Sequence, residues 1–280
     1  MRINIAKSAG FCFGVKRALD IASKLTKAAG SVYMLGDIVH NEDVSKRIEK
    51  SGIKKINRLK KVNSGILLIR AHGASQGALR KASRLGYQII DATCPMVKEI
   101  HKIVKDMHKK GYKIIVIGDK DHDEVQGIVG QLKEKTLVID NISHIPLAKV
   151  KKIKLACVVA QSTQNSKNVL KIVDILKNYV SDLKFFNTIC RPTRTKQEEI
   201  RSMPLKNDAM IIIGSKNSAN TKRLYEISRL LNKKTWRVNS REEIKPSWLK
   251  GVRDVGITAG ASTPEDTIKN IVKYIRSIRS

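Results

Sequence analysis

Aromatic residues are scarce in this sequence: tryptophan, tyrosine and phenylalanine together make up 4% of its 280 residues. Proteins that bind single-stranded nucleic acid stack the bases on aromatic side chains, so the scarcity argues against a platform of that kind. Long apolar runs are also missing, because Lys, Gly or Asp interrupts every apolar stretch well before the roughly 18 to 20 residues that a membrane span requires. We therefore expect no membrane segment.

Acidic residues are few as well, with 25 Asp and Glu against 55 Lys and Arg, and the formal net charge is +30. A charge of this size can attract nucleic acid, an acidic protein or an anionic substrate. The basic residues are spread along nearly the whole chain, and basic clusters such as KVKKIK are short. This distribution favours a generally lysine-rich surface over a dedicated nucleic-acid site.

The N-terminal segment MRINIAKSAGFCFGVK has neither the apolar core nor the cleavage site of a secretory signal, so we expect a cytoplasmic protein. The sequence has four widely spaced cysteines and no C-x-x-C pair. In a reducing compartment this pattern does not suit a disulfide framework, and a structural zinc site normally uses close pairs. Metal binding, catalysis and simple burial remain open for each cysteine.

Short β-branched runs alternate with helical patterns of about 10 to 18 residues, which is typical of parallel α/β structure. The runs are nearly all apolar, as expected of a sheet covered on both faces. The expected strands are INIAK near the N-terminus and the ranges 31–36, 65–71, 87–92, 112–118, 154–160, 182–187, 208–214 and 254–259.

The segments after these strands form an internal repeat. MLGDIVHNEDV, LIRAHGASQGAL and DATCPMV recur in order as VIGDKDHDEV, VVAQSTQNS and NTICRPT. A third set, IIGSKNSANT and ITAGASTPED, is completed only by AKSAGFCFGV at the N-terminus. The repeat predicts three pseudo-symmetric α/β lobes with small, mostly parallel sheets, at 14–94, 95–190 and 191–280 plus 1–13. The alternative is that any α/β protein places small and polar residues where strands end and helices begin.

Ligands of parallel α/β sheets bind beyond the carboxyl ends of the strands, near helix N-termini. The residues at these positions are rich in thiols, imidazoles and hydroxyls: Cys12, His40, His72, Cys94, His122, Glu124, Ser162, Thr163, Cys190, Ser215, Asn217 and Ser262. The histidines, Ser215, Asn217 and Ser262 are neutral donors that can bind a phosphate or diphosphate. Glu124 either complements a helix dipole or, if buried, delivers a proton, with Ser162 and Thr163 as a relay or as substrate contacts.

Each repeat supplies one strand-end cysteine, and we expect Cys12, Cys94 and Cys190 to hold one iron–sulfur cluster at the centre of the three lobes. Three thiolates on a [4Fe-4S] cluster leave one iron open to substrate. Cys157 lies inside the expected strand 154–160, where we expect a core residue. If Cys157 were instead a fourth ligand, the protein would be an electron carrier.

The same segments, in order, resemble the signature segments of the 4-hydroxy-3-methylbut-2-enyl diphosphate reductases, the last enzymes of the non-mevalonate isoprenoid pathway. They are GFCFGVKRA, DIVHN, RAHG, DATCP, DHDEVQG with VGQ, AQST, NTIC, GSKNSAN and GITAGASTPE, and they extend over the full length. The resemblance implies three α/β lobes around a [4Fe-4S] cluster held by Cys12, Cys94 and Cys190. It also implies diphosphate contacts from His40, His72, His122, Ser215, Asn217 and Ser262.

The activity that the resemblance implies is a two-electron reductive dehydroxylation of the allylic diphosphate to isopentenyl and dimethylallyl diphosphate. Glu124 is then the proton donor, and ferredoxin or flavodoxin is the electron donor. The sequence departs from the family at two positions. Ser162 replaces a threonine that orients the substrate hydroxyl, and Lys216 stands where some members have serine, so a substrate contact there would use its backbone N–H. A nucleic-acid-binding iron–sulfur protein remains the rival class.

Overall fold

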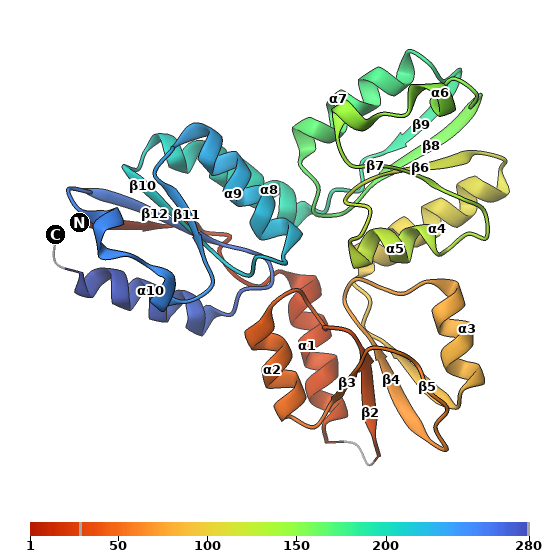
Figure 1. Cartoon of the computed structure of the whole chain (residues 1–280), viewed down its shortest axis with the longest axis horizontal. Coiled ribbons are helices and arrows are strands. Elements are labelled where there is room, and N and C mark those ends of the chain that lie inside the picture. The colour runs from red at the N-terminus through yellow and green to blue at the C-terminus, as the bar shows by residue number, and fades with distance from the viewer. Residues whose placement is uncertain (28–29, 279–280) are drawn as a thin grey trace. The chain divides into compact units, whose positions relative to one another are not determined.

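The computed structural model describes residues 1–27 and 30–278. Three four-stranded sheets are present in this part of the chain, and all their strand pairs are parallel (Figure 1). The chain divides into two compact units. The first unit consists of Met1–Lys16, Val39–Ser45 and Arg191–Ser280, and the second unit of Arg17–Ile38 and Lys46–Cys190.

The second unit contains two of the three sheets. The strand order of one is β3 (Lys54–Ile56), β2 (Val32–Leu35), β4 (Gly65–Ile69), β5 (Tyr87–Asp91). Helix α3 (Gln76–Arg84) packs on this sheet, and its buried Ala82 meets Leu67 and Ile69 of β4. Ser75 caps α3 by accepting a hydrogen bond from the backbone N–H of Ala78 at 3.2 Å. The helices α1 (Phe13–Leu25) and α2 (Glu42–Lys50) follow Cys12 and Asn41 in the sequence.

The other sheet of the second unit has the order β7 (Leu137–Ile139), β6 (Lys113–Ile117), β8 (Leu155–Ala160), β9 (Asp182–Phe186). Its strands are apolar on both faces because helices cover both. Ile115 of β6 packs with α7 (Ser166–Lys177), whereas Ile114 packs in the core formed with α4 (Pro95–Lys109) and α5 (Asp123–Val129). A short helix α6 (Leu147–Val150) and a 3₁₀ turn, Ile142–His144, complete this region.

The sheet of the first unit has the order β11 (Thr235–Val238), β10 (Ala209–Ile213), β12 (Asp254–Ala259), β1 (Arg2–Ile5). Helix α10 (Glu265–Ser277) packs on one face with Ile211, and α8 (Arg191–Ser202) and α9 (Ala219–Leu231) on the other with Ile212. Three 3₁₀ turns lie at Met203–Leu205, Arg241–Glu243 and Pro246–Leu249. The N-terminal strand is parallel to β12, with Ile3 opposite Val255, so the chain's beginning completes its last sheet as the repeat predicts.

The three sheets repeat one another in strand order and in backbone detail. In each, the glycine after the second strand of the order given above donates its N–H to the last residue of the neighbouring edge strand: Gly36 to Ile56, Gly118 to Ile139 and Gly214 to Val238. The predicted fold class is therefore confirmed. The sequence prediction did not include β3, β7 and β11. Charged residues interrupt the apolar pattern in β3 (KKI) and β11 (TWRV), and β7 has only three residues.

The lobe boundaries at 14–94, 95–190 and 191–280 plus 1–13 stay a prediction. Among the described residues, no helix is both long and apolar enough to cross a membrane.

Candidate functional site

Cys12, Cys94 and Cys190 occupy the same local position in their respective sheets. Each directly precedes a helix: α1, α4 or α8. Each also donates its backbone N–H to a carbonyl two residues beyond the strand β12, β4 or β8. The acceptors are Ala261 for Cys12 (3.1 Å), Ala71 for Cys94 (2.9 Å) and Ser162 for Cys190 (3.0 Å). Three equivalent turns thus present three cysteines at strand ends.

The chemistry of these cysteines suits a soft metal centre. All three are partly buried and none is in a disulfide. Cysteine side chains are the usual protein ligands of iron–sulfur clusters. Cys12 belongs to the first unit and the other two to the second. Their convergence on one cluster therefore stays a prediction.

Cys157 differs from the other three cysteines. It lies within β8, its side chain is fully buried, and it packs in the apolar core that contains Ile114 and Val159. Burial raises the pKa of the Cys157 thiol to about 12, so it remains a neutral thiol at neutral pH. This placement agrees with the predicted core role.

Glu124 is the second residue of α5, and its side chain is 2% exposed. Its carboxylate accepts two hydrogen bonds from Ser162, one from the backbone N–H at 2.6 Å and one from the hydroxyl at 2.8 Å. Burial raises the pKa of Glu124 above its ordinary value, while the two bonds from Ser162 act to lower it. A buried carboxyl whose pKa is raised holds its proton to higher pH than an exposed one and is suited to act as a proton donor.

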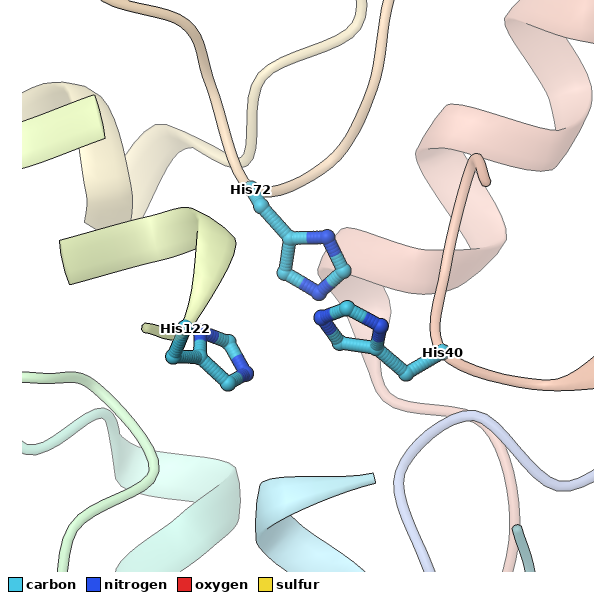
Figure 2. A group of neighbouring side chains, drawn as sticks. All are labelled: His40, His72 and His122. Carbon is cyan, nitrogen blue, oxygen red and sulfur yellow. The ribbon is translucent and has the colours of Figure 1, made fainter. Parts of the chain in front are cut away.

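His122 begins the same helix and caps it. Its Nδ1 accepts a hydrogen bond from the backbone N–H of Glu124 at 3.1 Å, so the proton of the neutral ring lies on Nε2. The ring of His72, which follows β4, lies edge-on to that of His122, with 5.5 Å between centroids and 89° between planes (Figure 2). The second unit thus pairs two predicted anion-binding imidazoles.

Ser215 and Asn217 follow β10 in the first unit, and both donate to one carboxylate oxygen of Glu42. The distances are 2.8 Å from the Ser215 hydroxyl and 2.9 Å from the Asn217 amide. Two neutral donors that converge on one anionic oxygen form the kind of contact that a phosphate oxygen would make. The sequence reasoning missed Glu42, although it directly follows the segment HN; only the folded structure places it against residues more than 170 positions away.

His40 and Ser262 are brought together in the same unit. The hydroxyl of Ser262, which is 7% exposed, donates to the backbone carbonyl of His40 at 3.1 Å. Figure 2 labels the His40 side chain. The structure thus gives Ser262 a backbone partner in the loop that carries His40.

Lys216, between Ser215 and Asn217, has an exposed side chain.

Thr163 is held by Gln161, which the sequence reasoning also missed. The Gln161 amide donates to the Thr163 hydroxyl at 3.1 Å, and its oxygen accepts from the backbone N–H of Asp119 at 2.9 Å. Gln161 is fully buried directly after β8. The sequence contained one signal for Gln161, because it is a polar residue directly after an apolar strand. Its bonds connect the turn that contains Ser162 and Thr163 to the turn after β6.

Three parallel sheets, with polar and thiol-bearing side chains on the turns that follow their strands, define an α/β protein. The chain belongs to the LytB protein family, whose model matches residues 3–276. It is 40% identical over 280 residues to a 4-hydroxy-3-methylbut-2-enyl diphosphate reductase of Geobacter metallireducens, covering 100% of this chain and 99% of that one. It is 37% identical to the enzyme of the same name from Clostridioides difficile, covering 99% of this chain and all of the other.

Two solved structures are similar over nearly the whole chain. One is (E)-4-hydroxy-3-methyl-but-2-enyl diphosphate reductase, described as the terminal enzyme of the non-mevalonate pathway, with 38% identity, 99% coverage of both chains and a TM-score of 0.71. The other is E-1-hydroxy-2-methyl-but-2-enyl-4-diphosphate reductase from Plasmodium falciparum, with 31% identity and a TM-score of 0.88. This second match covers 97% of this chain and 86% of the other.

Proposed function

We propose that this protein reduces (E)-4-hydroxy-3-methylbut-2-enyl diphosphate to isopentenyl diphosphate and dimethylallyl diphosphate. Membership of the LytB family supports this reaction. The observation that carries it is the buried carboxyl of Glu124, which is hydrogen-bonded by Ser162 and has a raised pKa. Loss of a hydroxyl group as water needs a proton donor, and this carboxyl is suited to that role.

Cys12, Cys94 and Cys190 would hold a [4Fe-4S] cluster. When bound, the cluster supplies two electrons, one at a time, and one open iron for the substrate hydroxyl. Burial of Cys157 in the core of its sheet supports a cluster with three protein ligands over a saturated electron-carrier cluster. All four cysteines then have roles that agree with their surroundings.

The remaining residues bind the diphosphate and move the proton. His122, with its proton on Nε2, would donate to a diphosphate oxygen together with His40, His72, Ser215, Asn217 and Ser262. The backbone N–H of Lys216 would add a donor. Glu124 protonates the departing hydroxyl, with Ser162 and Thr163 orienting it, and a second proton reaches one of two allylic carbons. The reaction thus consumes two electrons and two protons and releases one water.

The electrons would come from an acidic donor protein of the ferredoxin or flavodoxin type. A chain with a net charge of +30 attracts such a donor at low ionic strength. The rate with a protein donor should therefore fall as salt is added, whereas the rate with a small reductant such as dithionite should be much less sensitive.

The test is anaerobic purification, iron and sulfide analysis, and a reduction assay with the allylic diphosphate. Four irons and four sulfides per chain with formation of both products would support the proposal. A protein that takes up no cluster, or a reduced cluster that leaves the substrate unchanged, would refute it. Nucleic-acid binding with a steep salt slope that is unaffected by Glu124→Gln would instead support the rival class.

A further inference from the structure

Helix α8 begins directly after Cys190 and carries a buried lysine. Lys196 is 2% exposed, and its ammonium donates to three backbone carbonyls. Two belong to Gly10 and Ala259, each at 3.1 Å, and the third belongs to Ser8. Burial of an ammonium group is costly unless its donors are satisfied, and here three backbone carbonyls accept from it.

Glu199, one helical turn further along α8, contacts the same segment. Its carboxylate accepts hydrogen bonds from the backbone N–H of Ser8 at 3.1 Å and from the Ser8 hydroxyl. Lys196 thus holds the carbonyls of the turn 8–10, and Glu199 holds its donors. Residues three apart lie on the same face of a helix, so one face of α8 binds this turn.

The turn 8–10 leads directly to Cys12. Gly10 has a φ of +95°, a conformation that L side chains rarely adopt, and it lies two residues before the cysteine. Cys12 in turn donates its N–H to Ala261, two residues beyond Ala259. Lys196 therefore joins the two segments that position Cys12: the turn before it and the end of β12.

A second cation is placed in the same way in the second unit. Arg17, on the helix that follows Cys12, donates from its guanidinium to the carbonyl of Thr93 at 3.1 Å. Thr93 is buried and directly precedes Cys94. In both cases a cationic side chain on the helix after one cysteine donates hydrogen bonds to the backbone just before another cysteine.

We propose that Lys196 and Glu199 hold the turn 8–10 so that Cys12 is already positioned to bind the cluster, and that Arg17 does the same for Cys94. These are positioning residues, and the inference rests on the proposed function. Without the ammonium, three carbonyls, of which those of Gly10 and Ala259 are buried, lose this donor and the turn loosens. Cys12 must then lose conformational entropy when it binds iron, which weakens the binding, so the cluster dissociates faster.

The test compares Lys196→Met with Arg194→Met, which removes the same charge from the exposed side of α8. The measurement is the rate at which an anaerobic iron chelator removes the reconstituted cluster, followed by visible absorption. Loss of a residue that orients a ligand typically costs 10- to 100-fold in metal affinity, so we expect cluster loss about 10- to 100-fold faster in Lys196→Met than in Arg194→Met. Lys196→Arg should recover part of the difference, and Arg17→Met should also accelerate loss.

Equal rates in Lys196→Met and Arg194→Met would overturn the inference. If Lys196→Met does not fold, as judged by circular dichroism, Glu199→Gln is the deciding variant, because it leaves the ammonium in place and weakens only the Ser8 contacts. Glu199→Gln must then lose its cluster faster than Arg194→Met, or the inference fails. Failure of the unaltered protein to bind any cluster would instead refute the proposed function.

Discussion

Glu124 accepts both of its hydrogen bonds from a single residue, Ser162, at 2.6 Å from the backbone N–H and 2.8 Å from the hydroxyl. The two residues are 38 positions apart: Glu124 lies in the first turn of α5, and Ser162 lies on the turn after β8. Ser162 also accepts the backbone N–H of Cys190 at its carbonyl. One short turn therefore contacts both the predicted proton donor and the backbone of a predicted cluster ligand.

Substitution of Glu124 by glutamine should abolish most of the activity without loss of the cluster. Glutamine keeps the shape, its amide oxygen can accept from the Ser162 N–H and its NH2 can donate to the Ser162 hydroxyl, but it has no acidic proton to deliver. General acid catalysis contributes about 10²- to 10⁴-fold, so kcat should fall by that order. Steady-state rates and iron content measured on the same preparation check this, and near-normal kcat would exclude Glu124 as the proton donor.

The raised pKa of Glu124 predicts the pH dependence of kcat. The protonated form is the active one, so the rate should fall as pH rises through the raised pKa of this carboxyl. The hydroxyl of Ser162 lowers that pKa, so Ser162→Ala should raise it further and move the alkaline limb to higher pH. A pH–rate profile of both proteins tests the sign; a limb that moves to lower pH would contradict this assignment.

Glu42 predicts an unusual gain in substrate affinity. Its carboxylate accepts hydrogen bonds from Ser215 and Asn217, which are the donors proposed for the diphosphate. The carboxylate is also negatively charged, as the substrate is, and so competes with it for these donors. Hydrogen bonds to charged groups contribute about 1.5–3 kcal/mol, so Glu42→Ala should lower KM roughly tenfold. Asp43→Asn, the neighbouring carboxylate in the first turn of α2, is the control and should change KM little. A higher KM in Glu42→Ala would show that Glu42 supports the site.

Substitution of Cys157, a core residue, and of Cys190, a predicted cluster ligand, should have different effects on stability and iron content. Cys157→Ala removes one buried atom from the core of its sheet, which should lower the free energy of unfolding by about 1 kcal/mol, similar to loss of a buried methyl group. Its iron content should stay unchanged. Cys190→Ala should fold but lose the cluster. Iron analysis and urea unfolding of both variants distinguish these outcomes, and loss of iron in Cys157→Ala would point to a fourth ligand.

Much of the fold was predictable because local sequence determines it. Strands such as Lys113–Ile117 are β-branched and apolar, and small or polar residues mark their ends, so both the α/β class and the repeat could be inferred. The closing of the last sheet by the N-terminal strand followed from the repeat, because two sets were complete and the third lacked one piece. The edge strands β3, β7 and β11 were missed because β3 and β11 contain charged residues among their few apolar ones and β7 has only three residues.

Local sequence indicates which residues follow the strands and begin the helices, including Cys12, Glu124 and Ser215, because strand ends and helix starts depend on neighbouring residues. The partners of these residues depend on how distant segments pack together. Glu42 meets Ser215, and Lys196 meets Gly10, across more than 170 positions of sequence. Such contacts arise from the packing of separate elements, and no periodic pattern in the chain encodes them. The cysteines could be recognised from sequence, whereas the buried lysine that holds the turn before Cys12 could not.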